Sequence, residues 1–82
     1  MKTNKNIELT DKEVVLIKKL QGVANDWVKS GKELWLYSAS GTLWVMLRGD
    51  TKRNPFPEMK NGSPNPDNTV ISVNIANDGG DW

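Results

Sequence analysis

The chain has 82 residues and a formal net charge of +1, and it contains neither cysteine nor histidine. A chain of this length supports one small domain with one hydrophobic core. The lack of cysteine excludes disulfides and thiolate catalysis, and the lack of histidine removes the usual general base and the commonest metal ligand. With a net charge near zero, no strong electrostatic field draws the chain to nucleic acid or anionic lipid.

Residues 1–8 are polar, and we expect them to form a flexible N-terminus. Their basic start is not followed by an apolar run, and no later apolar run approaches the roughly 20 residues of a membrane span. The sequence therefore predicts a cytoplasmic location without membrane contact. We expect residues 9–82 to form a single small domain.

A helix is predicted to begin directly after Thr10. Thr10 and Glu13 have the spacing of a capping box, and Asp11 adds negative charge where the helix dipole favours it. Apolar residues then recur every three or four positions, as on one face of a helix: Val14, Ile17, Leu20, Val23 or Ala24, and Trp27 or Val28. Gly31 follows this run, which predicts that the helix ends there in a left-handed backbone conformation.

Two strand-like runs, residues 33–39 and 42–48, flank the dipeptide Ser-Gly, which is an acceptable tip for a two-residue hairpin turn. This turn predicts the following pairs: Ala39 with Thr42, Tyr37 with Trp44, Trp35 with Met46, Leu36 with Val45, Leu34 with Leu47 and, as a charge pair, Glu33 with Arg48. A three-residue turn with Gly41 in a bulge is the alternative, and it would shift the pairing.

The two-residue turn sorts the side chains of the hairpin onto two different faces. One face is aliphatic, and the other, here called the aromatic face, carries Trp35, Tyr37, Trp44 and Met46. A soluble strand usually leaves one face to water, so the large aromatic side chains on this second face need an explanation.

Residues 50–68 hold all four prolines and show no periodicity, which predicts a long Pro/Asn-rich loop. Residues 69–76 then alternate apolar and polar side chains and predict a third strand, and residues 77–82 form a tail. The predicted fold class is α+β, with the order helix, strand, strand, long loop, strand. We expect the helix to pack on the aliphatic face of a three-stranded antiparallel sheet.

Three explanations of the aromatic face remain open. The chain's own Phe56 with the proline loop, or Trp82 of the tail, covers it; or the face mediates self-association; or it recognises a ligand. We expect a non-enzymatic protein-interaction module that contacts a protein partner or a second copy of the chain. The predicted interaction residues are Trp35, Tyr37, Trp44 and Met46 as the contact centre, with Phe56 and Trp82 as flanks.

The alternative is a module that stacks single-stranded nucleic acid or sugar rings on the same aromatic side chains. Nucleic acid is weakly supported as a ligand, because a stacking module normally combines its rings with a positive groove. The loop cations that could contact phosphates are accompanied by as many acids: Lys52, Arg53 and Lys60 against Asp50, Glu58 and Asp67.

A small hydrolase-like enzyme has the least support. Ser38 and Ser40 have no histidine partner, and the carboxylates of the second half lie on the predicted loop and tail, where nothing would desolvate them. The tail acids Asp78 and Asp81, with Asn74 and Asn77, lack the spacing of a calcium loop. The sequence therefore predicts no catalytic residue, no metal site and no cofactor.

Overall fold

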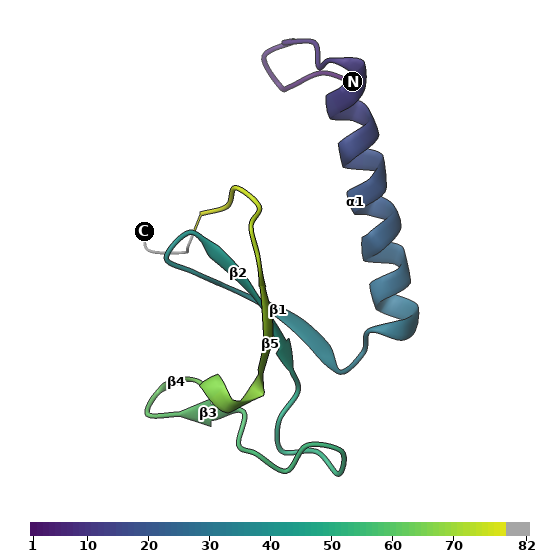
Figure 1. Cartoon of the computed structure of the whole chain (residues 1–82). Helices are drawn as coiled ribbons and strands as arrows, with labels where there is room; N and C mark the ends of the chain where they lie inside the picture. The colour runs from purple at the N-terminus through teal and green to yellow at the C-terminus, as the bar shows by residue number, and fades with distance from the viewer. Residues whose placement is uncertain (79–82) are drawn as a thin grey trace. The chain divides into compact units, whose positions relative to one another are not determined.

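The computed structural model describes residues 1–78 and divides into two compact units, residues 1–32 and residues 33–82 (Figure 1). The first unit holds α1 (Asp11–Ser30). The second holds β1 (Leu34–Ala39), β2 (Thr42–Leu47), β3 (Met59–Lys60), β4 (Ser63–Pro64), a 3₁₀ helix (Pro66–Asn68) and β5 (Thr69–Val73). The predicted α+β class, with one N-terminal helix and a three-stranded antiparallel sheet, is confirmed. The packing of α1 on that sheet stays a prediction.

The start of α1 has the predicted capping box. The Thr10 hydroxyl accepts a hydrogen bond from the Glu13 amide at 3.2 Å, and the Glu13 carboxylate accepts one from the Thr10 amide at 2.9 Å. Before the helix, Lys2 and Glu8 form an isolated antiparallel bridge, so residues 1–8 fold back on themselves. The helix is not apolar enough to cross a lipid bilayer, and the same holds for every helix in residues 1–78.

Gly31 ends α1, but its predicted left-handed conformation is wrong, because its φ is −106°. Its amide donates to the Trp27 carbonyl at 2.8 Å. A Cβ atom at this position would lie 3.3 Å from the Trp27 ring. Glycine therefore allows the close approach of the indole ring here, where a side chain would require the ring to shift slightly, and it does not supply a positive φ.

The β1–β2 hairpin has the predicted register, with Tyr37 opposite Trp44 and Trp35 opposite Met46. Ser40 and Gly41 both have positive φ, at 53° and 75°, as a type I′ turn requires. This turn favours the right-handed strand twist, which explains why the two-residue loop forms rather than the bulged alternative.

The predicted side-chain pair between Glu33 and Arg48 is wrong, although the Arg48 amide donates to the Glu33 carbonyl at 2.7 Å. Both side chains instead form ion pairs with residues of the connection between β2 and β5. Arg53 lies 3.1 Å from the Glu33 carboxylate, and Arg48 lies 3.4 Å from the Glu58 carboxylate. Arg48 also lies over the Trp35 ring, at 5.9 Å from its centroid.

The third strand of the sheet, β5, pairs antiparallel with β2, so the strand order is β1-β2-β5. It ends at Val73, three residues before the predicted end, because the chain then turns and the Ile75 amide donates to the Val73 carbonyl at 3.1 Å. The Asn77 side chain fixes this turn through bonds to the carbonyls of Ile75, at 2.6 Å, and Gly41, at 3.0 Å.

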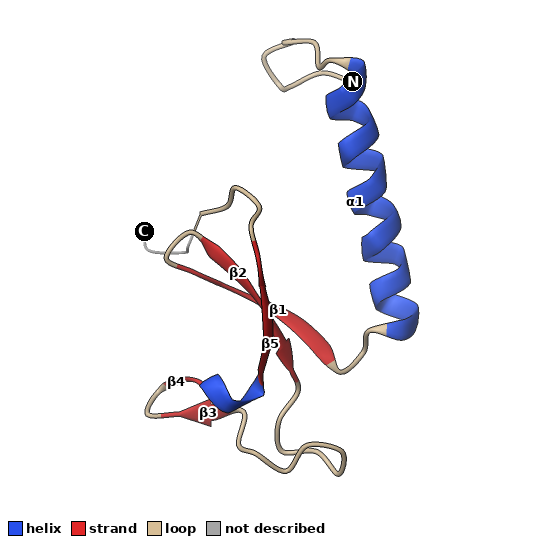
Figure 2. Cartoon of the chain, in the orientation of Figure 1, coloured by secondary structure: helices blue, strands red, loops and turns tan. Residues whose placement is uncertain are grey.

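The connection between β2 and β5 is more ordered than the predicted long loop (Figure 2). It contains a second hairpin, β3–β4, and then the 3₁₀ helix. Asn61 and Gly62 form the hairpin tip with φ values of 55° and 77°. Asn-Gly is the strongest short hairpin signal in a sequence. This hairpin was not predicted because the surrounding prolines indicated a loop.

Three asparagines are buried inside this connection: Asn54, Asn65 and Asn68. The Asn54 amide group donates to the Asn68 side-chain oxygen at 2.9 Å and to the Arg48 carbonyl at 3.3 Å. Asn65 and Asn68 both donate to the Pro57 carbonyl, at 2.9 and 3.0 Å. Because buried polar groups are costly unless they are bonded, this network fixes the connection in one conformation.

Candidate partner-binding pocket on the aromatic face

Alternation along β1 and β2 places the four predicted contact residues on one face of the sheet. Within β1, the rings of Trp35 and Tyr37 lie 6.2 Å apart between centroids, with an angle of 38° between their planes. Within β2, Trp44 is half-buried and Met46 is only 2% exposed. The aromatic face is therefore partly covered within the second unit itself.

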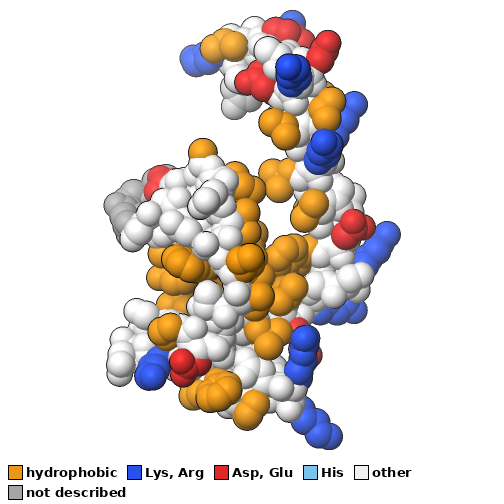
Figure 3. Space-filling model, viewed as in Figure 1, with side chains coloured by type: hydrophobic (Ala, Val, Ile, Leu, Met, Phe, Trp, Pro, Cys, Tyr) orange, Lys and Arg blue, Asp and Glu red, His pale blue; other side chains and the backbone are white. Residues whose placement is uncertain are grey.

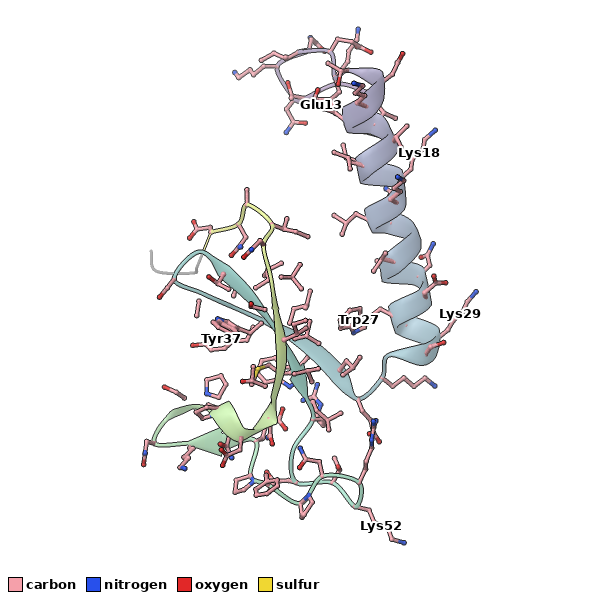
Figure 4. The ribbon with its side chains drawn as sticks, in the orientation of Figure 1. Glu13, Lys18, Trp27, Lys29, Tyr37 and Lys52 are labelled. Carbon is pink, nitrogen blue, oxygen red and sulfur yellow. The ribbon has the colours of Figure 1, made fainter. Side chains whose placement is uncertain are left out.

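A pocket of about 440 Å³ lies on this face. Six residues line it: Tyr37, Trp44, Met46, Pro64, Pro66 and Thr69. The Thr69 hydroxyl lies 3.5 Å from the Met46 sulfur. Figure 4 shows the Tyr37 side chain on the side of the sheet where the β3–β4 hairpin lies. The pocket thus combines two aromatic residues from the first hairpin with two prolines from the connection.

Asn65 fixes the two prolines, which stand immediately before and after it in the chain. It is 2% exposed, and its amide group donates to the Pro57 carbonyl at 2.9 Å. Its side-chain oxygen accepts from the Asp67 amide at 3.1 Å, and its backbone amide donates to the Glu58 carbonyl at 3.0 Å. This wall of the pocket is consequently preorganised by the buried asparagine network.

The other predicted contact residues do not line the pocket. Trp35 lies beside it, with its ring tilted toward Tyr37 and beneath the Arg48 guanidinium, and its buried indole nitrogen has no hydrogen-bond partner within residues 1–78. Phe56 is 54% exposed, and its backbone carbonyl accepts from the Asp50 amide at 2.8 Å. Trp82 lies outside the described residues.

Pro64, Pro66 and Thr69 are the pocket residues that the sequence prediction missed. The available signal was the Asn-Pro dipeptide, which occurs at Asn54 and again at Asn65. In both places the asparagine oxygen accepts from the amide two residues later, at 3.4 and 3.1 Å, as in an Asx turn. Proline has no amide hydrogen of its own, so it fits the middle position of this turn.

Two carboxylates of the connection accept hydrogen bonds from its backbone amides. Glu58 accepts a hydrogen bond from the Gly49 amide and pairs with Arg48, while Asp50 accepts from the Glu58 amide at 3.0 Å. Residues 1–78 contain no group of three acidic side chains arranged to hold a metal ion. Near the tail, the Ser38 hydroxyl lies 2.6 Å from both the Asn77 side-chain oxygen and the Asp78 carbonyl, and Asp81 lies outside the described residues.

The chemistry of the pocket suits an apolar group with a flat or ring-shaped surface. None of its six lining residues is charged, and their polar side-chain groups are the Tyr37 phenol, the Trp44 indole nitrogen and the Thr69 hydroxyl. The loop cations predicted as phosphate contacts, Lys52, Arg53 and Lys60, are exposed and do not line it. Comparison with protein-family models, with curated proteins and with solved structures found no match for this chain.

Proposed function

We propose that the chain is a non-enzymatic protein-interaction module of the cytoplasm, and that its aromatic pocket binds an extended, proline-containing segment of a partner protein. The observation that supports this proposal is the pocket between Tyr37, Trp44 and the two prolines, with the buried Met46 in its lining. Its volume of about 440 Å³ falls within the range of pockets that hold a defined group. Aromatic-lined grooves are a recurring means of binding proline-rich segments.

The composition of the lining favours a protein segment over a sugar or a nucleic acid. Sugars require several polar partners, and this pocket offers three polar side-chain groups, of which the Thr69 hydroxyl already contacts the Met46 sulfur. Single-stranded nucleic acid requires cations beside the stacking rings, and the lining has none. An apolar proline ring needs neither kind of group.

The proposal is tested by adding three probes separately to the isotope-labelled full chain: hexaproline, decathymidylate and cellohexaose. We expect hexaproline to shift the resonances of the Trp44 indole and the Thr69 amide. Trp44→Leu, which keeps an apolar strand residue, should remove the shift of the Thr69 amide, because aromatic anchors supply most of the binding energy of an interface. Ile71→Thr is the matched control, since Ile71 lies opposite Val45 on the other face of the sheet and is exposed.

Shifts with hexaproline that survive Trp44→Leu, or no shifts at all, contradict the proposal. Shifts at the pocket with decathymidylate or cellohexaose alone support the stacking alternative instead. Self-association through the aromatic face is tested by the solution mass without any probe. A dimer that Trp44→Leu dissociates and Ile71→Thr retains would identify a second copy as the protein partner.

A further inference from the structure

The apolar surface of α1 is wider than one packing face requires. At about 100° per residue, its apolar positions from Val23 round to Val14 cover about 180° of the helix circumference. A helix that packs one face on a core needs a stripe of roughly 100°. The predicted packing on the sheet can therefore use the part that carries Val14, Ile17, Ala24 and Val28, and leave the part from Val23 to Leu20 for a different contact.

One edge of this surface has the spacing of a coiled-coil seam. Leu16, Leu20, Val23 and Trp27, here called the heptad stripe, follow one another at intervals of four, three and four residues. Leu16 is 65% exposed, Leu20 64% and Val23 51%. Figure 3 shows hydrophobic side chains along one side of α1 and lysines along the other.

We propose that the heptad stripe pairs with the same stripe of a second copy of the chain, with the two helices antiparallel. A two-fold axis near the middle of the stripe places Leu20 against Val23 of the second copy, and Leu16 against Trp27 of the second copy. The next core positions of the heptad pattern, three residues before Leu16 and three after Trp27, are the polar residues Glu13 and Ser30, so the stripe ends there. These polar residues oppose a shift of the register by a full heptad.

The charges beside the stripe select the antiparallel arrangement. Lys19 and Asp26 both occupy the position that precedes a core residue, before Leu20 and Trp27 respectively. In an antiparallel pair such positions face each other, so Lys19 of each copy lies beside Asp26 of the other, and two ion pairs form. In a parallel pair they would face Ala24 and Gly31 of the second copy, which carry no charge. Neither residue has an ion pair within residues 1–78.

The test is sedimentation equilibrium of the full chain at low salt, using charge reversals on the exposed helix surface. We expect the wild type to form a dimer. The affinity of the dimer should fall about tenfold in each of the single variants Lys19→Glu and Asp26→Lys, because each change turns two attractions into two repulsions. The double variant Lys19→Glu/Asp26→Lys should regain the wild-type affinity, since the symmetry restores both ion pairs. Lys18→Glu is the matched control, because it removes the same charge from the opposite side of the helix.

Leu20→Gln should abolish the dimer without affecting the aromatic pocket, since the inference does not depend on the proposed function. A wild-type chain that stays monomeric at every concentration would overturn the inference. So would a dimer that both single reversals leave unchanged. A dimer that dissociates in Trp44→Leu but not in Leu20→Gln would move the contact to the aromatic face and overturn it as well.

Discussion

At the scale of single residues, the second unit depends on the absence of a side chain at Gly49. This buried glycine follows β2 and lies against the connection. A Cβ atom here would contact the Phe56 carbonyl and would lie 2.6 Å from the Asn68 side-chain nitrogen and 2.8 Å from the Glu58 amide. Two of these neighbours are backbone atoms held by hydrogen bonds, so the contact cannot be relieved by a side-chain rotation.

We therefore expect Gly49→Ala to lower the free energy of unfolding by about 2–3 kcal/mol, as overpacking does elsewhere. Urea denaturation followed by tryptophan fluorescence measures this loss. Gly22→Ala is the control, because a Cβ atom at Gly22 would meet nothing within 4 Å. In the helix interior that change should raise the stability of α1 by about 1 kcal/mol. Equal effects of the two variants would contradict this assignment.

At the scale of elements, the β3–β4 hairpin carries one proline of the pocket wall. Gly62, at its tip, has a φ of 77°, a conformation that costs a residue with a side chain about 1 kcal/mol. Gly62→Ala should therefore loosen the hairpin and weaken the hexaproline shifts, while the β1–β2 hairpin keeps its dispersed resonances. The amides of Lys60 and Ser63, which face each other across the hairpin, report the loosening by faster hydrogen exchange.

Lys60→Ala is the control for this element, because it leaves the tip conformation unchanged and removes only an exposed side chain. If hexaproline bound Gly62→Ala and the wild type equally, Pro64 would not be held in the pocket by the hairpin. The pocket wall would then depend on Asn65 and its bonds alone.

The elements also show which parts of the structure a single sequence can specify. The hairpin register and the capping box depend on residues within a few positions of each other, so local rules predicted them. The asparagine network joins Asn54 to Asn68 and Arg48 across the connection, and no periodic pattern marks such contacts. The register accordingly predicted that Tyr37 and Trp44 share one face of the sheet, whereas no local rule predicted Pro64 and Pro66 beside them.

At the scale of the whole molecule, little apolar surface is fully buried. Within residues 1–78, Met46 is the only hydrophobic side chain that is buried, while exposed apolar residues occur in both units. Native stability is a small difference between large opposing terms, so a chain with so small a core gains much from any contact that covers apolar surface. Association and folding of this chain should consequently be coupled.

This coupling predicts that the midpoint of thermal unfolding, Tm, rises with protein concentration. A partner at about 100 times its dissociation constant adds about 2.7 kcal/mol, which raises the Tm of a domain of this size by roughly 10–20 °C. Calorimetry over a wide concentration range measures the shift. Leu20→Gln should remove the dependence if the heptad stripe forms the contact, whereas Trp44→Leu should remove it if the aromatic face does. A Tm that is constant in the wild type would mean that contacts within one chain, including the predicted packing of α1 on the sheet, stabilise it without association.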